Sequence, residues 1–412
     1  MGREREARLR DAGMGRECKA QLQDAGMGLG REAQPQDAAW GVNVKSSRRT
    51  PAWGMNVKRS CRMPAWKLGA WHKVYKKWEN SMIKEPIRVG TMMLMNRLVM
   101  PPMATYKSTE DGKVTEELLA YYRERSRGGR IGLIITEHSY IEQRGKARVN
   151  QLSIASDSDI DGLRRLTDVI RQSGTKVMAQ LNHAGSAAPS SATGSRAVSA
   201  SSVILPVRPM MGDGTEPEAL TQEQIRGVIQ SFADAARRAQ EAGYDGVEIH
   251  SAHAYLLNQF YSPLTNQRSD VYGGSLENRL RIHMEVIQAV RKVVGDAYPV
   301  AVRLGGCDYT EGGSSIQDCA AAAKAFEQAG VDLIDLSGGM CRYMRPDHDE
   351  PGYFQDMSRA VRETVSIPVL LTGGITDIRD ADRLLEAGAA DLISVGRALL
   401  KNPKWADEAM RE

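Results

Sequence analysis

Short apolar runs alternate with longer segments of helical periodicity from residue 97 to the end of the chain. Segments such as 221–243 and 275–295 carry apolar residues at the three- and four-residue spacing of an amphipathic helix. Strands that alternate with such helices indicate βα units around a parallel sheet. The apolar runs that we predict as strands are RLVMPPM (97–103), IGLIITE (131–137), KVMAQL (176–181), DGVEIH (245–250), PVAVRLGG (299–306), VDLIDLSGG (331–339), PVLLTGG (368–374) and ADLISVG (390–396).

Several of the helical segments carry their own start and stop signals. Thr221 with Gln224 and Ser275 with Asn278 place a hydroxyl cap three residues before a polar side chain, and glycine follows several of the segments. A doubly wound sheet is the alternative to a closed barrel. Because the runs number eight, and because polar or glycine residues follow nearly every one, we predict an α/β fold, a (β/α)8 TIM barrel over residues 82–412.

The first 81 residues differ from the rest. GREREARLRDAGM is followed by the similar GRECKAQLQDAGM, and five of the six Trp lie between Trp40 and Trp78. A basic, Trp-bearing arm that binds nucleic acid or a membrane is one interpretation. The repeats are short and lack apolar periodicity, so we favour tandem DNA repeats read in frame. Residues 1–81 are thus expected to be a disordered or non-native leader, with translation starting at Met82.

The charge of the chain is unevenly distributed. Residues 1–81 hold 17 Lys and Arg against 8 Asp and Glu, and the remainder holds 38 against 43. A mildly acidic barrel gives no reason to expect nucleic acid or a membrane as a partner. Five scattered cysteines without a CxxC pair, and the lack of an apolar span or secretory signal, favour the cytoplasm.

The run from 246 to 255 carries the strongest candidate chemistry. His250, His253 and Tyr255 follow the end of a predicted strand, where barrel enzymes place their catalytic side chains. Two imidazoles and a phenol can bind a carbonyl or anionic oxygen while a proton is delivered. Metal binding would require a further ligand, and we expect Glu248 to point away by strand alternation. We therefore assign the three residues as catalytic and expect no metal.

Two glycine-rich turns follow the seventh and eighth predicted strands. They contain Gly373 and Gly374 in the first turn, after Thr372, and Gly396 with Arg397 in the second. Barrel enzymes hold phosphate groups at these two positions, with backbone N–H groups and a guanidinium as donors. Each glycine could be ordinary turn punctuation. The joint position of the turns favours a phosphate site.

Two polar residues interrupt apolar strands. Arg303 lies in VRLGG and Gln180 in VMAQL. A buried guanidinium requires a partner. A structural ion pair is one solution, and a flavin ring, whose N1 and C2 carbonyl edge becomes negative on reduction, is the other.

With these residues identified, the chain from Met82 resembles the Old Yellow Enzyme family of FMN-dependent NADH:flavin oxidoreductases and ene-reductases. Residues 96–103 are similar to the family's first strand, and residues 262–279 to its most recognisable signature, which is mostly architectural. The resemblance implies that FMN is held by Pro102, Met103, Ala104, Gln180, Arg303, Gly373, Gly374, Gly396 and Arg397. Ala104 departs from the Cys or Thr of many relatives, so the resemblance implies a different flavin redox potential here.

The resemblance also implies a reaction. A small activated alkene would be reduced at its C=C bond by NAD(P)H, through FMN, in a ping-pong cycle. His250 and His253 would bind the substrate carbonyl, Tyr255 would donate the α-proton, and Tyr106 would form the second wall of the substrate pocket. The sequence leaves open whether the chain forms a homo-oligomer.

Two alternatives remain. Glu412 ends the chain early in the eighth predicted helix, so the barrel could be the N-terminal part of a longer iron–sulfur flavoprotein of the 2,4-dienoyl-CoA reductase or enoate reductase type. The other alternative is a fragment that binds flavin without turnover.

Overall fold

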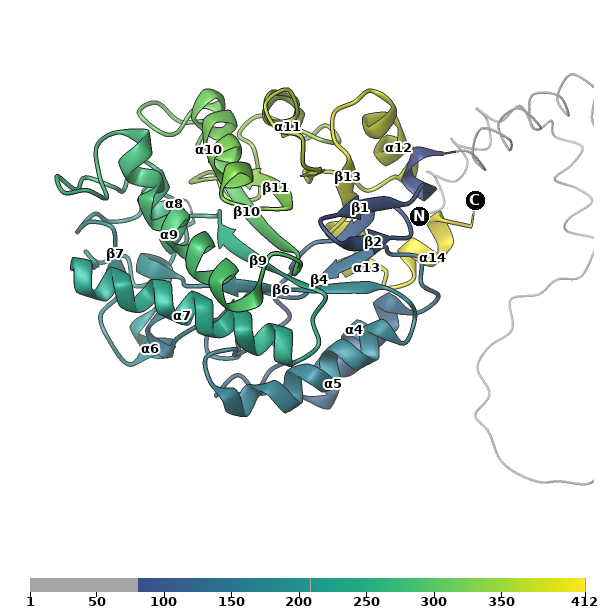
Figure 1. The fold of residues 1–412 in the computed structure, drawn as a ribbon, viewed down its shortest axis with the longest axis horizontal. Helices are drawn as coiled ribbons and strands as arrows, with labels where there is room; N and C mark the ends of the chain where they lie inside the picture. The colour runs from purple at the N-terminus through teal and green to yellow at the C-terminus, as the bar shows by residue number, and fades with distance from the viewer. Residues whose placement is uncertain (1–80, 208, 412) are drawn as a thin grey trace, which may run out of the picture. The chain divides into compact units, whose positions relative to one another are not determined.

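A closed barrel of eight parallel strands dominates the computed structural model, which describes residues 81–207 and 209–411 (Figure 1). Neighbouring strands are hydrogen-bonded all the way round, since β4 pairs with β6 as well as β3. The predicted TIM barrel is confirmed. Its strands are β3 (Leu98–Met100), β4 (Leu133–Ile135), β6 (Lys176–Asn182), β9 (Gly246–Ser251), β10 (Val300–Cys307), β11 (Leu333–Gly338), β12 (Val369–Leu371) and β13 (Leu392–Ser394).

A helix follows each barrel strand within the described residues, and the main hydrophobic core lies between these helices and the strands. Thr221 and Ser275 are the N-caps of α7 and α9, as predicted, and the Thr221–Gln224 pair forms a complete capping box. The helices are α4 (Glu116–Ser126), α5 (Ile160–Arg171), α7 (Gln222–Glu241), α9 (Leu276–Val294), α10 (Ile316–Gln328), α11 (Gln355–Arg362), α12 (Ile378–Glu386) and α13 (Arg397–Lys401).

Short elements decorate the two ends of the barrel. The β1–β2 hairpin lies at one end, and α6, β7 and α8 lie at the other (Figure 1). The short elements are η1 (Met82–Lys84), β1 (Ile87–Val89), β2 (Met92–Leu94), β5 (Ser139–Tyr140), η2 (Gln143–Gly145), η3 (Asp157–Asp159), η4 (Gly185–Ala187), α6 (Ser190–Thr193), β7 (Val198–Ser199), β8 (Glu218–Ala219), α8 (Leu256–Tyr261) and α14 (Trp405–Ala409).

The hairpin closes the N-terminal end of the barrel. Its buried side chains, Val89, Met92 and Leu94, form a second hydrophobic cluster with residues near the starts of the barrel strands. The strand members of that cluster are Val99, Leu133, Ile135, Met178, Ala301, Leu333, Leu370 and Leu392. The floor of the barrel is therefore a packed apolar plug.

The side chains inside the barrel change from apolar to polar between the floor and the next inward-facing position along the strands, two residues further on. Side chains two residues apart on a strand point to the same face, so the positions following the floor also point inward. At those positions the apolar residues give way to Gln180, Arg303, Asp335, Thr372 and Ser394. The polar end of the barrel is its C-terminal end, where barrel enzymes carry their sites.

The segment 262–279 is architectural, as expected. Asn266 donates to the backbone oxygens of Phe260 and Tyr272, at 2.7 and 2.8 Å. Arg279 donates to those of Tyr261 and Gly274, both at 2.8 Å. These bonds fix the long connection between α8 and α9, and none of the four partners lines the main pocket.

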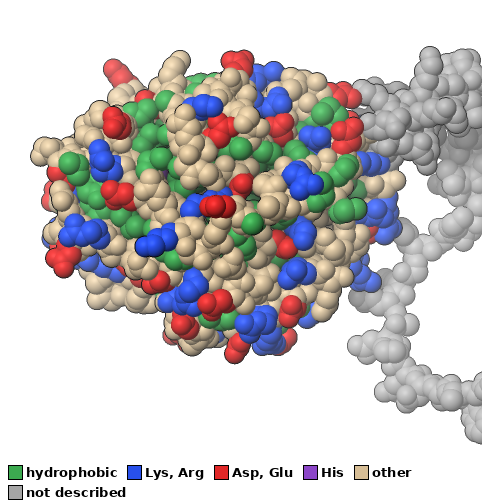
Figure 2. Space-filling model, in the orientation of Figure 1, with side chains coloured by type: hydrophobic (Ala, Val, Ile, Leu, Met, Phe, Trp, Pro, Cys, Tyr) green, Lys and Arg blue, Asp and Glu red, His purple; other side chains and the backbone are tan. Residues whose placement is uncertain are grey.

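Three further observations concern the predictions made for the ends and surface of the chain. The repeats of the predicted leader lie outside the described residues, so the boundary between residues 81 and 82 stays a prediction. No helix within 81–207 and 209–411 is long and apolar enough to cross a membrane. Figure 2 shows basic and acidic side chains interspersed over the visible face of the barrel, with no extended field of one sign.

Candidate active site

A pocket of about 490 Å³ opens at the C-terminal ends of the barrel strands. All predicted site residues line it, together with others that the sequence did not single out. Asp and Glu are missing from the described residues of this lining. The lining consists of Pro101, Pro102, Met103, Ala104, Tyr106, His138, Arg148, Gln180, Met211, His250, His253, Tyr255, Arg303, Arg342, Tyr343, Tyr353, Thr372, Gly373, Gly374, Ile375, Ser394, Gly396, Arg397 and Leu400.

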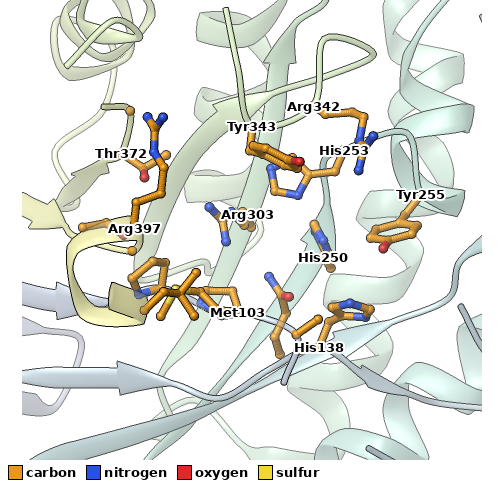
Figure 3. Close-up of a pocket in the computed structure, with 18 of the residues that line it drawn as sticks. Met103, His138, His250, His253, Tyr255, Arg303, Arg342, Tyr343, Thr372 and Arg397 are labelled. Atoms are coloured by element: carbon orange, nitrogen blue, oxygen red, sulfur yellow. The ribbon is translucent and has the colours of Figure 1, made fainter. Parts of the chain in front are cut away.

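The predicted phosphate turns form one side of this pocket. Arg397 and Thr372 lie on the opposite side of Arg303 from His253 and Tyr255 (Figure 3). Gly373 and Gly374 have φ of 120° and 70°, which side chains rarely adopt. A Cβ on Gly373 would lie 2.9 Å from the Tyr353 ring, so bare backbone is required here.

His250, His253 and Tyr255 form the other side of the pocket. The two imidazole rings are perpendicular with centroids 5.2 Å apart, and the Tyr255 ring lies 5.1 Å from that of His250. His253 has φ of 61°, a left-handed conformation that a side chain adopts only when its surroundings enforce it. Asn258 and Gln259 of α8 supply that constraint, because their amides bond the backbone of Ala254 at 2.8 and 2.6 Å.

Burial sets the protonation states of this side. It lowers the pKa values of His250 and His253 well below 6.5, and the positive charge of Arg303 lowers both further. Both imidazoles are therefore neutral at physiological pH. One nitrogen of His253 lies 2.7 Å from the Ser337 hydroxyl. Burial raises the pKa of Tyr255 to about 12, so its phenol keeps its proton.

A polar layer lies between the two sides, in the centre of the barrel. Arg303 Nε is 3.2 Å from Asp335 Oδ2, and Gln180 donates to Glu248 at 2.8 Å. The prediction that Glu248 points away from the site was wrong. Glu248 and His250 are two residues apart on β9 and therefore share its inward face, where Glu248 lies one layer below the pocket.

The two carboxyl groups of this layer do not behave alike. Burial and the neighbouring Asp335 raise the pKa of Glu248 well above its ordinary value, so Glu248 is protonated at neutral pH. Burial raises the pKa of Asp335 to about 6, with the Arg303 guanidinium acting in the opposite direction. Asp335 thus carries the negative charge of the pair above that pH. Arg303 therefore has the structural ion pair that was one of the two alternatives, and it also lines the pocket, where the other alternative would place a flavin ring.

The loop after β3 forms a further part of the pocket wall. Pro102, Met103 and Ala104 line it, and the following Thr105 donates through its backbone N–H and its hydroxyl to Glu137, at 2.6 and 3.1 Å. Glu137 ends the second predicted strand, so its carboxyl group ties one barrel loop to the next. Burial raises its pKa to about 7.

Among the lining residues that sequence reasoning missed are His138, Arg148, Arg342 and Tyr343. A signal existed for His138, because it directly follows IGLIITE at the catalytic end of a strand. Its Nδ1 lies 2.8 Å from the Gln151 amide nitrogen, which can only donate, so the neutral ring carries its proton on Nε2. The other three lie in loops, whose paths no periodicity predicts.

The lining fits FMN. Among the described residues, the Arg397 side chain donates a hydrogen bond only to the Tyr353 hydroxyl, at 3.3 Å, which leaves donors for a phosphate beside the bare glycine turns. Two lining residues, His250 through Nδ1 and Ser394 through Oγ, have buried polar atoms without a hydrogen-bond partner among the described residues, and a bound flavin could satisfy them. No group of three or more potential metal ligands occurs within the described residues.

Comparison with known proteins also points to a flavin oxidoreductase. The profile of the NADH:flavin oxidoreductase / NADH oxidase family matches residues 83–412. The NADPH dehydrogenase of Bacillus subtilis is 39% identical over 329 residues, which are 79% of this chain and 94% of that protein. The NADH oxidase of Thermoanaerobacter brockii is 38% identical over 328 residues, 78% of this chain and 50% of that protein. This chain therefore spans about half the length of some curated relatives.

Solved structures agree with the sequence matches. A 2-naphthoyl-CoA reductase complex superposes with a TM-score of 0.75 at 26% identity, over 81% of this chain and 52% of that one. An old yellow enzyme homologue from Zymomonas mobilis superposes with a TM-score of 0.69 at 29% identity, over 79% of this chain and 93% of that one. The chain belongs to the NADH:flavin oxidoreductase / NADH oxidase family, the Old Yellow Enzyme family, whose cofactors are FMN and NAD(P)H.

Proposed function

We propose that this chain is an NAD(P)H-dependent FMN ene-reductase, which reduces the C=C bond of small α,β-unsaturated carbonyl compounds. The observation that carries the proposal is the perpendicular His250–His253 pair beside Tyr255, across the pocket from the phosphate turns. FMN would be held by the loop after β3, by the central polar layer and by the phosphate turns: Pro102, Met103, Ala104, Gln180, Arg303, Gly373, Gly374, Gly396 and Arg397.

The two histidines would bind the substrate through its carbonyl oxygen. Each neutral imidazole has one N–H to donate, and the hydrogen bonds strengthen as negative charge develops on that oxygen. Ser337 orients His253, and Tyr106 would form the outer wall of the pocket. FMN bound there and reduced by NAD(P)H would supply a hydride for the β-carbon.

Tyr255 would donate the proton to the α-carbon. Its pKa of about 12 keeps the phenol protonated at neutral pH, and its ring lies next to that of His250. General acids of this kind contribute roughly 10²- to 10⁴-fold to a rate. Binding at the histidines would fix the alkene at one distance from the phenol, so the hydride and the proton reach neighbouring carbons.

The Tyr255→Phe variant tests the proposal. Reoxidation of the reduced enzyme by an enone should slow by roughly 100-fold or more, while reduction of the flavin by NAD(P)H proceeds as before. Stopped-flow absorbance at the flavin band measures both half-reactions. Equal loss of both would contradict the proton-donor role, and a wild-type enzyme that oxidises NAD(P)H but reduces no enone would overturn the function.

A longer protein is the second candidate. The chain is about as similar to the T. brockii NADH oxidase, of which it covers 50%, as to the B. subtilis NADPH dehydrogenase, of which it covers 94%. The barrel would then work beside further domains, as in an iron–sulfur enzyme of the 2,4-dienoyl-CoA reductase or enoate reductase type. A cysteine-rich reading frame downstream of codon 412 supports this candidate, and a stop codon shortly after it contradicts it.

A reducing compartment, the cytoplasm, is our proposal for its location. Cys307, Cys319 and Cys341, the described cysteines, are free thiols. Fractionation of the source cell with an antibody against the barrel tests this location.

A further inference from the structure

Two arginines at the rim of the pocket have no acidic partner among the described residues. Of the four that line it, Arg303 pairs with Asp335, and Arg397 lies beside the phosphate turns. Arg148 and Arg342 make no ion pair and no side-chain hydrogen bond to any other described residue, and Arg342 Nε is buried. FMN chemistry accounts for the first two cations and leaves these two unexplained.

Two arginines without acidic partners are unusual in these surroundings. The barrel outside the leader holds more acidic than basic residues, yet no Asp or Glu is among the described residues of the pocket lining. Arg345, three residues after Arg342, pairs with Asp356 at 3.0 Å, so an acidic partner is available nearby to an arginine with a structural role. The two rim arginines line a site to which the described residues contribute no carboxylate.

Each rim arginine is accompanied by a tyrosine. The Arg148 guanidinium carbon lies 5.1 Å from the ring centre of Tyr106, and that of Arg342 lies 5.1 Å from the ring centre of Tyr343. Both tyrosines are half exposed, at 50% and 52%. The rim therefore carries two matched Arg–Tyr pairs, which present both charge and aromatic surface to whatever enters.

The backbone holds Arg342 in place. Its φ of 62° is left-handed, and its N–H donates to Gly339 in a tight turn at 2.9 Å. A Cβ on Gly338 would lie 2.1 Å from the Arg342 carbonyl oxygen, and one on Gly339 would lie 2.1 Å from Asp308. The buried Asp308 also accepts from the backbone of Met340 at 2.7 Å. A backbone turn that is strained, and held in that conformation by a buried side chain such as Asp308, is typical of a functional position.

Arg148 is connected to the pocket wall through Gln151. The Gln151 side chain accepts from the Ala147 backbone at 2.6 Å and bonds the His138 ring at 2.8 Å. The turn that carries Arg148 therefore shares its anchor with a side chain that lines the pocket. Both rim guanidiniums lower the pKa of Tyr255 against the effect of burial, which places their charges within electrostatic reach of the proposed proton donor.

We propose that the substrate of this enzyme is an activated alkene that carries an anionic group, a carboxylate or a phosphate, bound at the rim by Arg148 and Arg342. The inference rests on the proposed ene-reductase function and adds the substrate class. The anion would bind at the rim while His250 and His253 bind the carbonyl further in. Guanidiniums match carboxylate and phosphate oxygens in geometry as well as charge.

Kinetics on a matched substrate pair test the proposal. 4-Oxopent-2-enoate and hex-3-ene-2,5-dione differ by a carboxylate in place of an acetyl group of similar size. In the FMN-loaded full chain, Arg148→Met and Arg342→Met should each lower the ratio of kcat/KM for the anionic over the neutral substrate by about tenfold. Unchanged ratios in both variants, here and with the thioesters below, would overturn the proposal.

Two further variants are controls. Arg144→Met removes a positive charge four residues from Arg148, at a residue that pairs with Glu218 outside the pocket, and should leave the ratio as it is. Arg342→Lys keeps the charge and should restore part of the ratio. A ratio that falls as far in Arg144→Met as in Arg148→Met would mean that net charge, and not the rim site, decides, and would overturn the proposal.

The source of the anion is resolved with thioesters. Crotonyl-4′-phosphopantetheine and the neutral crotonyl-pantetheine differ by one phosphate, so loss of their ratio alone identifies a phosphate, and loss of the 4-oxopent-2-enoate ratio alone identifies a carboxylate. Flavin reduction by NADPH is followed in the same variants. Slower reduction by NADPH with both substrate ratios unchanged would assign the arginines to the reductant and overturn the proposal.

Binding separates this inference from the proposed function. Titration of the oxidised enzyme with 4-hydroxybenzoate and 4-hydroxyacetophenone requires no turnover. Preference for the benzoate that falls about tenfold in Arg342→Met supports the rim site even if no alkene is reduced. Alkene reduction together with equal affinity for both ligands in every variant overturns the rim site and leaves the proposed function standing.

Discussion

The two ends of the barrel interior are built from the same strands and have opposite chemistry. At the N-terminal end, Leu333 and Leu370 pack with the β1–β2 hairpin in a dry cluster. Two residues further along the same strands, Asp335 and Thr372 face a polar layer and a pocket. The pairing of β11 with β10 is continuous from Leu333 to Asp335, so the difference between these two levels lies in the side chains.

This difference separates stability from function. Apolar side chains at the floor stabilise the folded state because they are removed from water. Polar side chains at the upper end, such as Glu248 and His250, are buried with atoms that lack partners, which costs free energy unless a ligand satisfies them. We expect substitutions at the floor to lower the free energy of unfolding, and substitutions above it to change binding and redox chemistry.

The largest expected effect is at the floor. Leu333 is completely buried, so Leu333→Ala should lower the free energy of unfolding by about 2 to 5 kcal/mol, through lost apolar burial and a new cavity. Leu333→Ile keeps the volume and should cost less than about 1.5 kcal/mol. Urea unfolding of the full chain measures both. Similar stabilities of the two variants would contradict the view of the floor as a tightly packed plug.

The next effect is at the upper end and concerns affinity. His250→Ala and His253→Ala should each weaken binding of 4-hydroxybenzaldehyde by roughly tenfold or more, because a hydrogen bond to a charged oxygen is lost. Spectral titration of the flavin band gives the dissociation constants. His348→Ala, at a residue outside the pocket lining, is the control. Unchanged affinity in both site variants would exclude the histidines as carbonyl ligands.

The contributions of two neighbouring residues, Glu137 and His138, to the free energy of unfolding should depend on pH in opposite directions. Burial lowers the pKa of His138 to about 4, so its contribution to stability is lost as the pH falls below about 6.5, where the unfolded chain takes up a proton and the native chain does not. Burial raises the pKa of Glu137 to about 7, so its contribution is lost as the pH rises from about 4.5 to 7.

The variants His138→Asn and Glu137→Gln remove these opposing slopes one at a time. At pH 5 the histidine accounts for up to about 2 kcal/mol. Urea unfolding between pH 5 and 7 should therefore show a steeper loss on acidification for Glu137→Gln than for the wild type, and a shallower one for His138→Asn. Parallel curves for the three proteins would contradict the assigned protonation states.

The smallest expected effect is on the redox potential of bound FMN, and it compares the two carboxyl groups of the polar layer. Asp335→Asn removes the counter-charge of Arg303, so the site becomes more positive and favours the reduced flavin. The midpoint potential of bound FMN should rise by about 30 mV, equivalent to about 1.4 kcal/mol. The rise should disappear below about pH 6, where Asp335 is protonated in the wild type.

Glu248→Gln is the matched control for that measurement. Glu248 is protonated at neutral pH, so the amide changes no charge and should shift the potential by much less. Equal shifts in the two variants would mean that the carboxyl groups share the negative charge, and the assignment of that charge to Asp335 would be wrong.

Much of the fold and part of the site follow from local patterns. Eight apolar runs predicted the eight strands, and the residues at their ends, such as His250 and Arg303, were found because a strand carries them to one end of the barrel. The error over Glu248 was one of counting, since two residues along a strand return to the same face. Arg148 and Arg342 escaped because loop paths depend on contacts with distant residues, such as Asp308 below the Arg342 turn.

The sequence by itself determined the barrel, its polar end and the residue types gathered there, because the two-residue period of strands and the caps of helices are local properties. Only the tertiary structure decided the protonation states of Glu248, Asp335 and the histidines, since burial and neighbouring charges come from strands far apart in the chain. Tertiary structure likewise brought Arg148 and Arg342 to one rim with no acidic partner. Charge and solvation depend on what surrounds a group in space, and the linear order of residues does not contain that information.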